Sequence, residues 1–254
     1  MNSPRLRLLA ALAAVSLVSA ASAQSVIYRE VFGRTAGTGN ASLSTYNWLG
    51  YSGATAVNES ASFGNFGIAP EGTAGSGSFS NVNSLAAVNS GAVTPVDNGR
   101  TFFFGSGIFL AYTTEYTVNR STNSITTITW DQRNDGPALS AAVQIGGNWY
   151  ASSTVPGGGG GTAWSVASLN FQTTSWTAVN FTAGSTLSIG ATTVLPAGDI
   201  TGFGIFGPTA RGTTGARLDG YTINATAIPE PSTYAALVGA AVLGLAACRR
   251  RARS

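Results

Sequence analysis

The chain of 254 residues contains no histidine. Histidine is the commonest general base and a frequent zinc ligand, so its absence excludes Ser-His-Asp catalysis, Cys-His catalysis and His-based zinc sites. Nucleotide-binding glycine motifs are also missing. The segment Gly37-Thr38-Gly39 and the glycine run at 157–161 lack the lysine or the following helix that such motifs require. We therefore expect no catalytic residues and no cofactor.

Cysteine and charge are scarce as well. The single cysteine, Cys248, lies near the C-terminal end, so the residues before it must fold on a hydrophobic core without a disulfide. Lysine is absent, and six of the 13 arginines lie before residue 24 or after residue 228. The stretch between holds seven arginines against nine acidic residues, a net charge of about −2. It has no basic patch for phosphate, and we expect no nucleic-acid partner.

The N-terminal end has the pattern of a secretory signal peptide. Arg5 and Arg7 precede an apolar run at 8–18, which is too short to span a membrane, and small residues follow it. This pattern predicts export by the general secretion machinery and removal of residues 1–23. The predicted cleavage site is marked by Ala21, Ala23 and Gln24.

The C-terminal end, residues 228–254, joins a rigid turn, an apolar run and a basic cluster without a gap. Ser232 stands at an N-cap position, and the run after it is rich in Ala and Leu, which predicts a transmembrane helix over 233–248. The apolar part at 234–248 spans about 22 Å, and snorkelling arginines make up part of the ~30 Å hydrocarbon thickness. By the positive-inside rule the arginines stay in the cytoplasm. This membrane stop consists of Arg249, Arg250, Arg251 and Arg253.

A buried core helix should not run straight into four arginines, and a plain tail anchor leaves the prolines before the helix unexplained. The three parts together resemble the PEP-CTERM sorting domain, which is read by the membrane-embedded protease exosortase. The resemblance covers about a tenth of the chain. It implies exosortase as a partner, a membrane anchor before sorting, and then a place at the cell surface or outside the cell, associated with exopolysaccharide. The sorting motif it implies is Pro229, Glu230, Pro231 and Ser232.

Period-two alternation dominates the body at 24–227, and Gly or Pro separates nearly every segment. Thr126, Ile128 and Trp130 are expected on one strand face, and the residues around Gly146-Gly147 are expected to form a hairpin with a two-residue primed turn. Many short strands without an interior helix predict an all-β fold with a single β-sandwich. The pattern loosely resembles jelly-roll or concanavalin-A-like sandwiches, in which the first and last strands pair. Strands are expected at 26–32, 100–104, 108–112, 141–145, 176–181, 186–189, 202–206 and 218–225, and long loops with short strands at 60–90.

Two groups of body residues are candidates for ligands. Asp131 and Asp135 flank a segment that could hold Ca²⁺, but Arg133 between them favours a simple hairpin turn after a strand ending at Trp130. The aromatic residues could form a sugar-stacking platform, although tryptophan more often fills sandwich cores. Alternation places Trp149 and Tyr150 on opposite faces, so we expect one of the two to be exposed. The candidate glycan contacts are Trp149, Tyr150 and Trp164.

The function expected first is therefore a non-enzymatic surface or matrix protein. The alternative is a lectin-like module of the same architecture, in which exposed aromatic residues bind a polysaccharide. A weaker alternative is a glycoside hydrolase, for which Glu115 and Asp131 are the candidate carboxylates.

Overall fold

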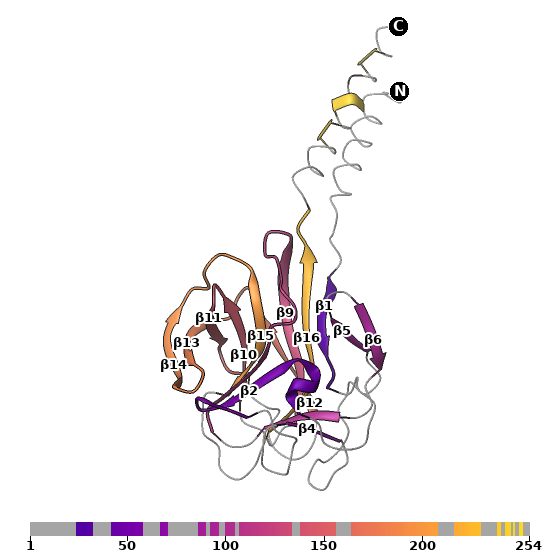
Figure 1. Ribbon diagram of the computed structural model, residues 1–254. Helices are drawn as coiled ribbons and strands as arrows, with labels where there is room; N and C mark the ends of the chain where they lie inside the picture. Colours follow the sequence, from indigo (N-terminus) through magenta and orange to yellow (C-terminus); the bar gives the residue numbers. More distant parts are fainter. Residues whose placement is uncertain are drawn as a thin grey trace.

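The computed structural model describes residues 24–32, 42–57, 107–133, 138–155, 164–207 and 216–229. The backbone alone is described for residues 67–70, 86–89, 92–96, 100–104 and 216, and isolated helical residues are described between residues 238 and 250. The described body is all-β, with two curled eight-stranded sheets and one short 3-10 helix, η1 (Leu43–Tyr46). The expected all-β class is confirmed (Figure 1).

Sheet A is arranged around the longest strand, β16, which is bonded along both edges. One edge of β16 pairs with β9, and the other pairs with β1 and, near its start, with β7. The first and last strands are therefore antiparallel neighbours, as the jelly-roll resemblance implied (Figure 1). Sheet A contains β12 (Trp164–Asn170), β9 (Asn123–Arg133), β16 (Ala216–Ala227), β1 (Ser25–Glu30), β5 (Ala86–Asn89), β6 (Ala92–Val96), β7 (Arg100–Phe104) and β4 (Gly67–Pro70).

Sheet B runs in the order β14-β13-β11-β10-β15-β8-β2-β3. The hairpin between β10 and β11 has Gly146 and Gly147 at φ 58° and 81°, the two positive values of a type I′ turn, so the predicted primed turn is confirmed. Its strands are β14 (Thr186–Thr193), β13 (Trp176–Thr182), β11 (Asn148–Ser152), β10 (Ser140–Ile145), β15 (Ile200–Gly207), β8 (Phe109–Thr113), β2 (Trp48–Ser52) and β3 (Thr55–Ala56).

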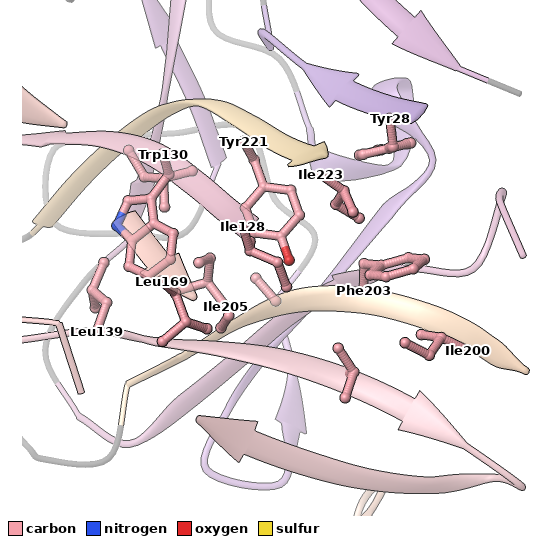
Figure 2. Close-up of a cluster of buried hydrophobic side chains, with 14 of the residues drawn as sticks. Tyr28, Ile128, Trp130, Leu139, Leu169, Ile200, Phe203, Ile205, Tyr221 and Ile223 are labelled. Carbon is pink, nitrogen blue, oxygen red and sulfur yellow. The ribbon is translucent and has the colours of Figure 1, made fainter. Parts of the chain in front are cut away.

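The main core lies between the two sheets and is made by alternate residues of their strands. Figure 2 shows Trp130 and Tyr221 among the aliphatic side chains of this cluster. Burying each large apolar side chain contributes roughly 1.5–3 kcal/mol, and such burial has to stabilise a body that contains no cysteine. Fully buried members include Tyr28, Trp48, Ile128, Phe203, Ile205, Tyr221 and Ile223.

Alternation predicts the core face of β9 only in part. Ile128 and Trp130 face the core as expected, but the third expected member, Thr126, is only partly buried, and Ile125 takes its place. The register between β9 and β16 shifts between Asn224 and Ala225, and such a bulge reverses the side to which the next residues point.

Sheet B curls strongly toward the side that faces away from the main core. The turn between β13 and β14 reaches the turn between β2 and β3, where the amide of Gly184 donates a hydrogen bond of 2.8 Å to the carbonyl of Ala54. These strands lie near opposite edges of the sheet, so only a curled sheet brings them together. The concave side holds a second apolar cluster, made of Leu110, Ala142, Trp149, Ala151, Val179, Leu187 and Phe206.

Gly204 allows β15 and β8 to approach closely beneath this second cluster. A Cβ at this position would collide with the carbonyl oxygen of Ala111 and lie 2.8 Å from the Cα of Tyr112. Because both obstacles are backbone, we expect Gly204→Ala to lower the free energy of unfolding by about 1–3 kcal/mol, measured by urea denaturation. Gly190→Ala on the edge strand β14, whose Cβ would lie 3.0 Å from one carbonyl, should cost less. Equal losses in the two variants would contradict this account.

Within the described residues, no helix is long and apolar enough to cross a membrane. The helix predicted over 233–248 falls largely outside those residues, with Val238, Gly239, Ala246 and the residues 242–244 described as helical.

Candidate functional site

The predicted sorting motif begins where the sandwich ends. β16 finishes at Ala227, which pairs with Asn123 of β9, and the amide of Ile228 still donates a hydrogen bond of 2.7 Å to the carbonyl of Thr122. Pro229 is the next residue. The motif therefore follows the fold without a linker. Its other members, Glu230, Pro231 and Ser232, lie outside the described residues.

The predicted signal cleavage site is equally close to the fold. Gln24 is exposed and donates from Nε2 to Oγ1 of Thr127 at 3.2 Å. The next residue, Ser25, pairs with Ala225 of β16. The body thus begins and ends on neighbouring strands. Ala21 and Ala23 lie outside the described residues.

The predicted membrane stop is described only in part. Arg249 and Arg250 are helical and exposed, while Arg251 and Arg253 lie outside the described residues.

The aromatic residues proposed as glycan contacts do not form an exposed platform. Trp149 is 4% exposed on the concave side of sheet B, Tyr150 is partly buried against the main core, and Trp164 is partly buried on β12. The expectation that one of the Trp149–Tyr150 pair is exposed is wrong, because the curl of sheet B covers the face that alternation would leave to solvent. Four of the five tryptophans are buried, so the expectation that most belong to the core is confirmed: Trp48, Trp130, Trp149 and Trp176.

Aromatic rings fill the concave side of sheet B. The ring of Tyr112 lies 4.6 Å from Trp149 and is stacked at 6.1 Å on Tyr51, which in turn contacts Phe181 at 4.7 Å, edge to face. Burial raises the pKa of Tyr112 to about 12, and the neighbouring hydroxyl group of Tyr51 adds to the shift. These rings are partners of one another and therefore stabilise the curl.

The segment at 131–133 is strand rather than turn. β9 continues to Arg133, with Asp131 2% exposed and Arg133 6% exposed, so the expected hairpin turn directly after Trp130 is wrong. Pairing with β12 on one edge and β16 on the other extends the strand. Asp135 lies outside the described residues, and no group of three or more acidic, His or Cys residues suited to a metal occurs among those described.

Asp131 belongs to a buried charged cluster on the outer side of sheet A. It lies directly opposite Asp219 of β16, which is fully buried. Arg133 and Arg217 occupy the same side, each two positions from one of these aspartates along its strand, and are also buried. Among the described residues of this cluster, two cations stand beside two anions, which lowers the cost of burying each charge.

The carboxylates proposed for glycoside hydrolysis are separated by sheet A. The carboxylate of Glu115 accepts hydrogen bonds from the core-facing Tyr28 at 3.2 Å and from Nδ2 of Asn47 at 2.8 Å. Asp131 lies on the opposite side of sheet A, away from the core. The two carboxylates therefore cannot flank one glycosidic bond, as that chemistry requires.

A cavity of about 550 Å³ was not expected from the sequence. It lies where the connection from β12 to β13 passes from one sheet to the other, next to the end of β14. Its volume is in the range of small-molecule sites, roughly 300–1,000 Å³. Three segments far apart in the chain build it, so no local motif could have indicated it. The lining residues are Arg120, Phe171, Gln172, Thr174, Ser175, Trp176 and 192–195.

The cavity joins an apolar wall to a set of polar groups. Phe171 and Trp176, each 5% exposed, lie with ring centroids 5.1 Å apart. The polar lining includes Arg120, which comes from a separate segment of the chain. Its Nη1 donates a hydrogen bond of 2.7 Å to the carbonyl of Pro196, which holds the guanidinium in place. Such a combination of apolar lining and a few oriented polar groups is typical of ligand sites.

Comparison with known proteins identifies the C-terminal end. Residues 227–251 match the family model of the PEP-CTERM protein-sorting motif. No curated protein matches the chain. The crystal structure of a Stig cyclase, Fisc from Fischerella sp. TAU, in complex with (3Z)-3-(1-methyl-2-pyrrolidinylidene)-3H-indole, is similar over 81% of this chain and 100% of that chain. The TM-score is 0.46 and the sequence identity 14%, and at that level the activity of the cyclase does not transfer to this chain. The chain therefore carries a PEP-CTERM sorting motif directly behind an all-β body with jelly-roll-like sheets.

Proposed function

We propose that this chain is an exported protein that is held at the inner membrane by its C-terminal segment, sorted by exosortase, and placed at the cell surface or in the extracellular matrix. The match of residues 227–251 to the PEP-CTERM motif carries the proposal, because PEP-CTERM signals are recognised by exosortase. A folded body that contains no cysteine and ends at Ile228, immediately before the motif, suits this role.

The body is proposed to be non-enzymatic. Histidine is absent, and the candidate carboxylates Glu115 and Asp131 lie on different sides of sheet A. An association with exopolysaccharide would give such a body its role outside the cell.

A second candidate function is glycan binding by the body, and the cavity beside Trp176 is the observation that favours it. Unlike the residues predicted from sequence, which form no exposed platform, the residues around this cavity enclose a space and combine apolar with polar lining. A purified body that binds no oligosaccharide would leave the surface-protein proposal intact and remove this one.

Replacing Pro229, Glu230 and Pro231 together by alanine is expected to block sorting, because it removes the rigid turn between the body and the apolar segment. Intact mass and fractionation should show a shortened chain outside the inner membrane for the unaltered protein. The variant, and the unaltered protein in cells without the sorting protease, should keep the full tail and stay with the inner membrane. Pro196→Ala, a proline change outside the motif, is the control. Retention of the full tail in both strains would contradict processing at this signal.

A further inference from the structure

We propose that the cavity beside Trp176 is a binding site for a saccharide unit that carries a carboxylate, and that Arg120 recognises this carboxylate. The inference rests on the second candidate function, glycan binding, and names its substrate class and its specificity-determining residue.

The charge of Arg120 is the first argument. Within the described part of the chain, no carboxylate forms an ion pair with its guanidinium; one nitrogen, Nη1, is bonded to the Pro196 carbonyl, and the remaining N–H groups are available. Asp199 accepts a hydrogen bond from the backbone amide of Arg120 at 3.3 Å, and its carboxylate does not line the cavity. None of the described residues that line the cavity is acidic. A fixed, unneutralised guanidinium at a cavity without acids favours a carboxylate ligand, which it can bind through two parallel hydrogen bonds.

The indole of Trp176 is the second, independent argument. The side chain is 95% buried, and the small accessible remainder lines the cavity. Its Nε1–H has no hydrogen-bond partner in the part of the chain that the structure describes. The nitrogen is not among the fully buried, unpaired side-chain atoms of the described residues, so it is accessible and can donate to a hydroxyl or ring oxygen of a ligand.

The other lining groups match a saccharide better than a simple organic acid. Thr192 is exposed at the rim and its hydroxyl bonds to no described residue. Gln172 uses its Nε2 to hold the carbonyl of Ile125 at 2.8 Å, which leaves its Oε1 available as an acceptor. Several donors and acceptors spaced around an apolar wall complement a molecule that has an apolar ring face and a rim of hydroxyl groups.

Calorimetric titration of the full-length chain in a non-ionic detergent tests the proposal. The probes are trigalacturonic acid and its neutral counterpart galactotriose. We expect the acid to bind at least tenfold more tightly than the neutral trisaccharide, with affinity that falls as salt is added. Arg120→Gln should weaken binding of the acid by about 10- to 100-fold and leave the weak binding of galactotriose unchanged, while Arg120→Lys should restore part of the loss.

Two further variants separate recognition from folding. Thr192→Val changes an exposed hydroxyl and should reduce the affinity for both probes without lowering thermal stability. Arg29→Gln is the matched control, because Arg29 is a partly buried arginine of sheet A that is bonded to Thr222 and does not line the cavity. It should leave both affinities unchanged.

The possible outcomes distinguish this inference from the function on which it rests. Equal binding of the two trisaccharides, unaffected by Arg120→Gln, would overturn the carboxylate preference and keep a glycan-binding body. No binding of either probe would overturn both. Binding of the acid that Arg29→Gln weakens as much as Arg120→Gln would show unspecific charge attraction and overturn the assignment to the cavity.

Discussion

Replacing Trp130 by alanine is expected to lower the free energy of unfolding by about 3–5 kcal/mol. Trp130 is 1% exposed in the main core, and its Nε1 donates a hydrogen bond of 2.8 Å to Oε1 of Gln132, which is itself buried. The substitution would open a large cavity between the sheets and remove one hydrogen-bond partner of a buried amide. Domains are typically stable by only about 5–15 kcal/mol, and this body has no cysteine to add a cross-link. Thermal and urea denaturation would measure the loss.

Two variants divide this loss into its parts. Trp130→Phe keeps an aromatic ring but removes the indole N–H, so it should cost less stability than Trp130→Ala. The loss that remains includes the cost of leaving Oε1 of Gln132 without its hydrogen bond. Trp164→Ala is the matched control on β12, where the ring is only partly buried, and it should cost clearly less. A loss for Trp164→Ala equal to that for Trp130→Ala would contradict the central place of Trp130 in the core.

Replacing Asp219 by alanine is expected to cost a similar amount, about 3–5 kcal/mol, for an electrostatic reason. Asp219 is fully buried and lies in the charged cluster with Asp131, Arg133 and Arg217. Its removal would leave a buried excess of positive charge. It would also remove the hydrogen bond of 2.7 Å from the amide of Gly220 to Oδ1 of Asp219, at a residue with a φ of 58°. The measurement is again the free energy of unfolding in urea.

Asp131 and Asp219 lie directly opposite each other on neighbouring strands. Whether Asp219→Asn raises or lowers the free energy of unfolding therefore shows whether repulsion between them controls the cluster. If repulsion between two like charges controlled the cluster, Asp219→Asn would stabilise the fold, and that result would contradict a balanced cluster. We expect Asp219→Asn to destabilise it, though less than Asp219→Ala, since the amide keeps one acceptor for Gly220. Asp199→Ala, at an exposed carboxylate, should change stability by less than about 0.5 kcal/mol.

Local patterns predicted much of the fold because they carry strand and turn chemistry directly. The alternation of Ala141, Val143 and Ile145 places all three in the main core, and two glycines between β10 and β11 predict the I′ turn. The expected strands at 100–104, 176–181 and 202–206 correspond to β7, β13 and β15. Strands β2 and β12 were not predicted, because most residues of β12 are polar or small and β2 is only five residues long.

The remaining features depend on contacts between distant segments. A bulge in the pairing with β16, invisible in β9 itself, puts Ile125 rather than Thr126 into the core. The curl of sheet B buries Trp149, which alternation alone would leave on an open face. The polar sequence at 131–133 is typical of a turn, yet both edges of that segment are paired with neighbouring strands. The cavity beside Arg120 combines three separate segments, so only the fold brings its groups together.

The position of β16 determines how the body responds to tension. The strand is bonded to β9 from Leu218 to Ala227 and to β1 from Tyr221 to Ala225, and its last residues lead straight into the sorting motif. When a pull on that C-terminal segment runs along the strand axis, the cross-strand bonds on both edges of β16 resist it in shear. Anchorage through a strand that is paired on both edges thus spreads the load over two neighbouring strands.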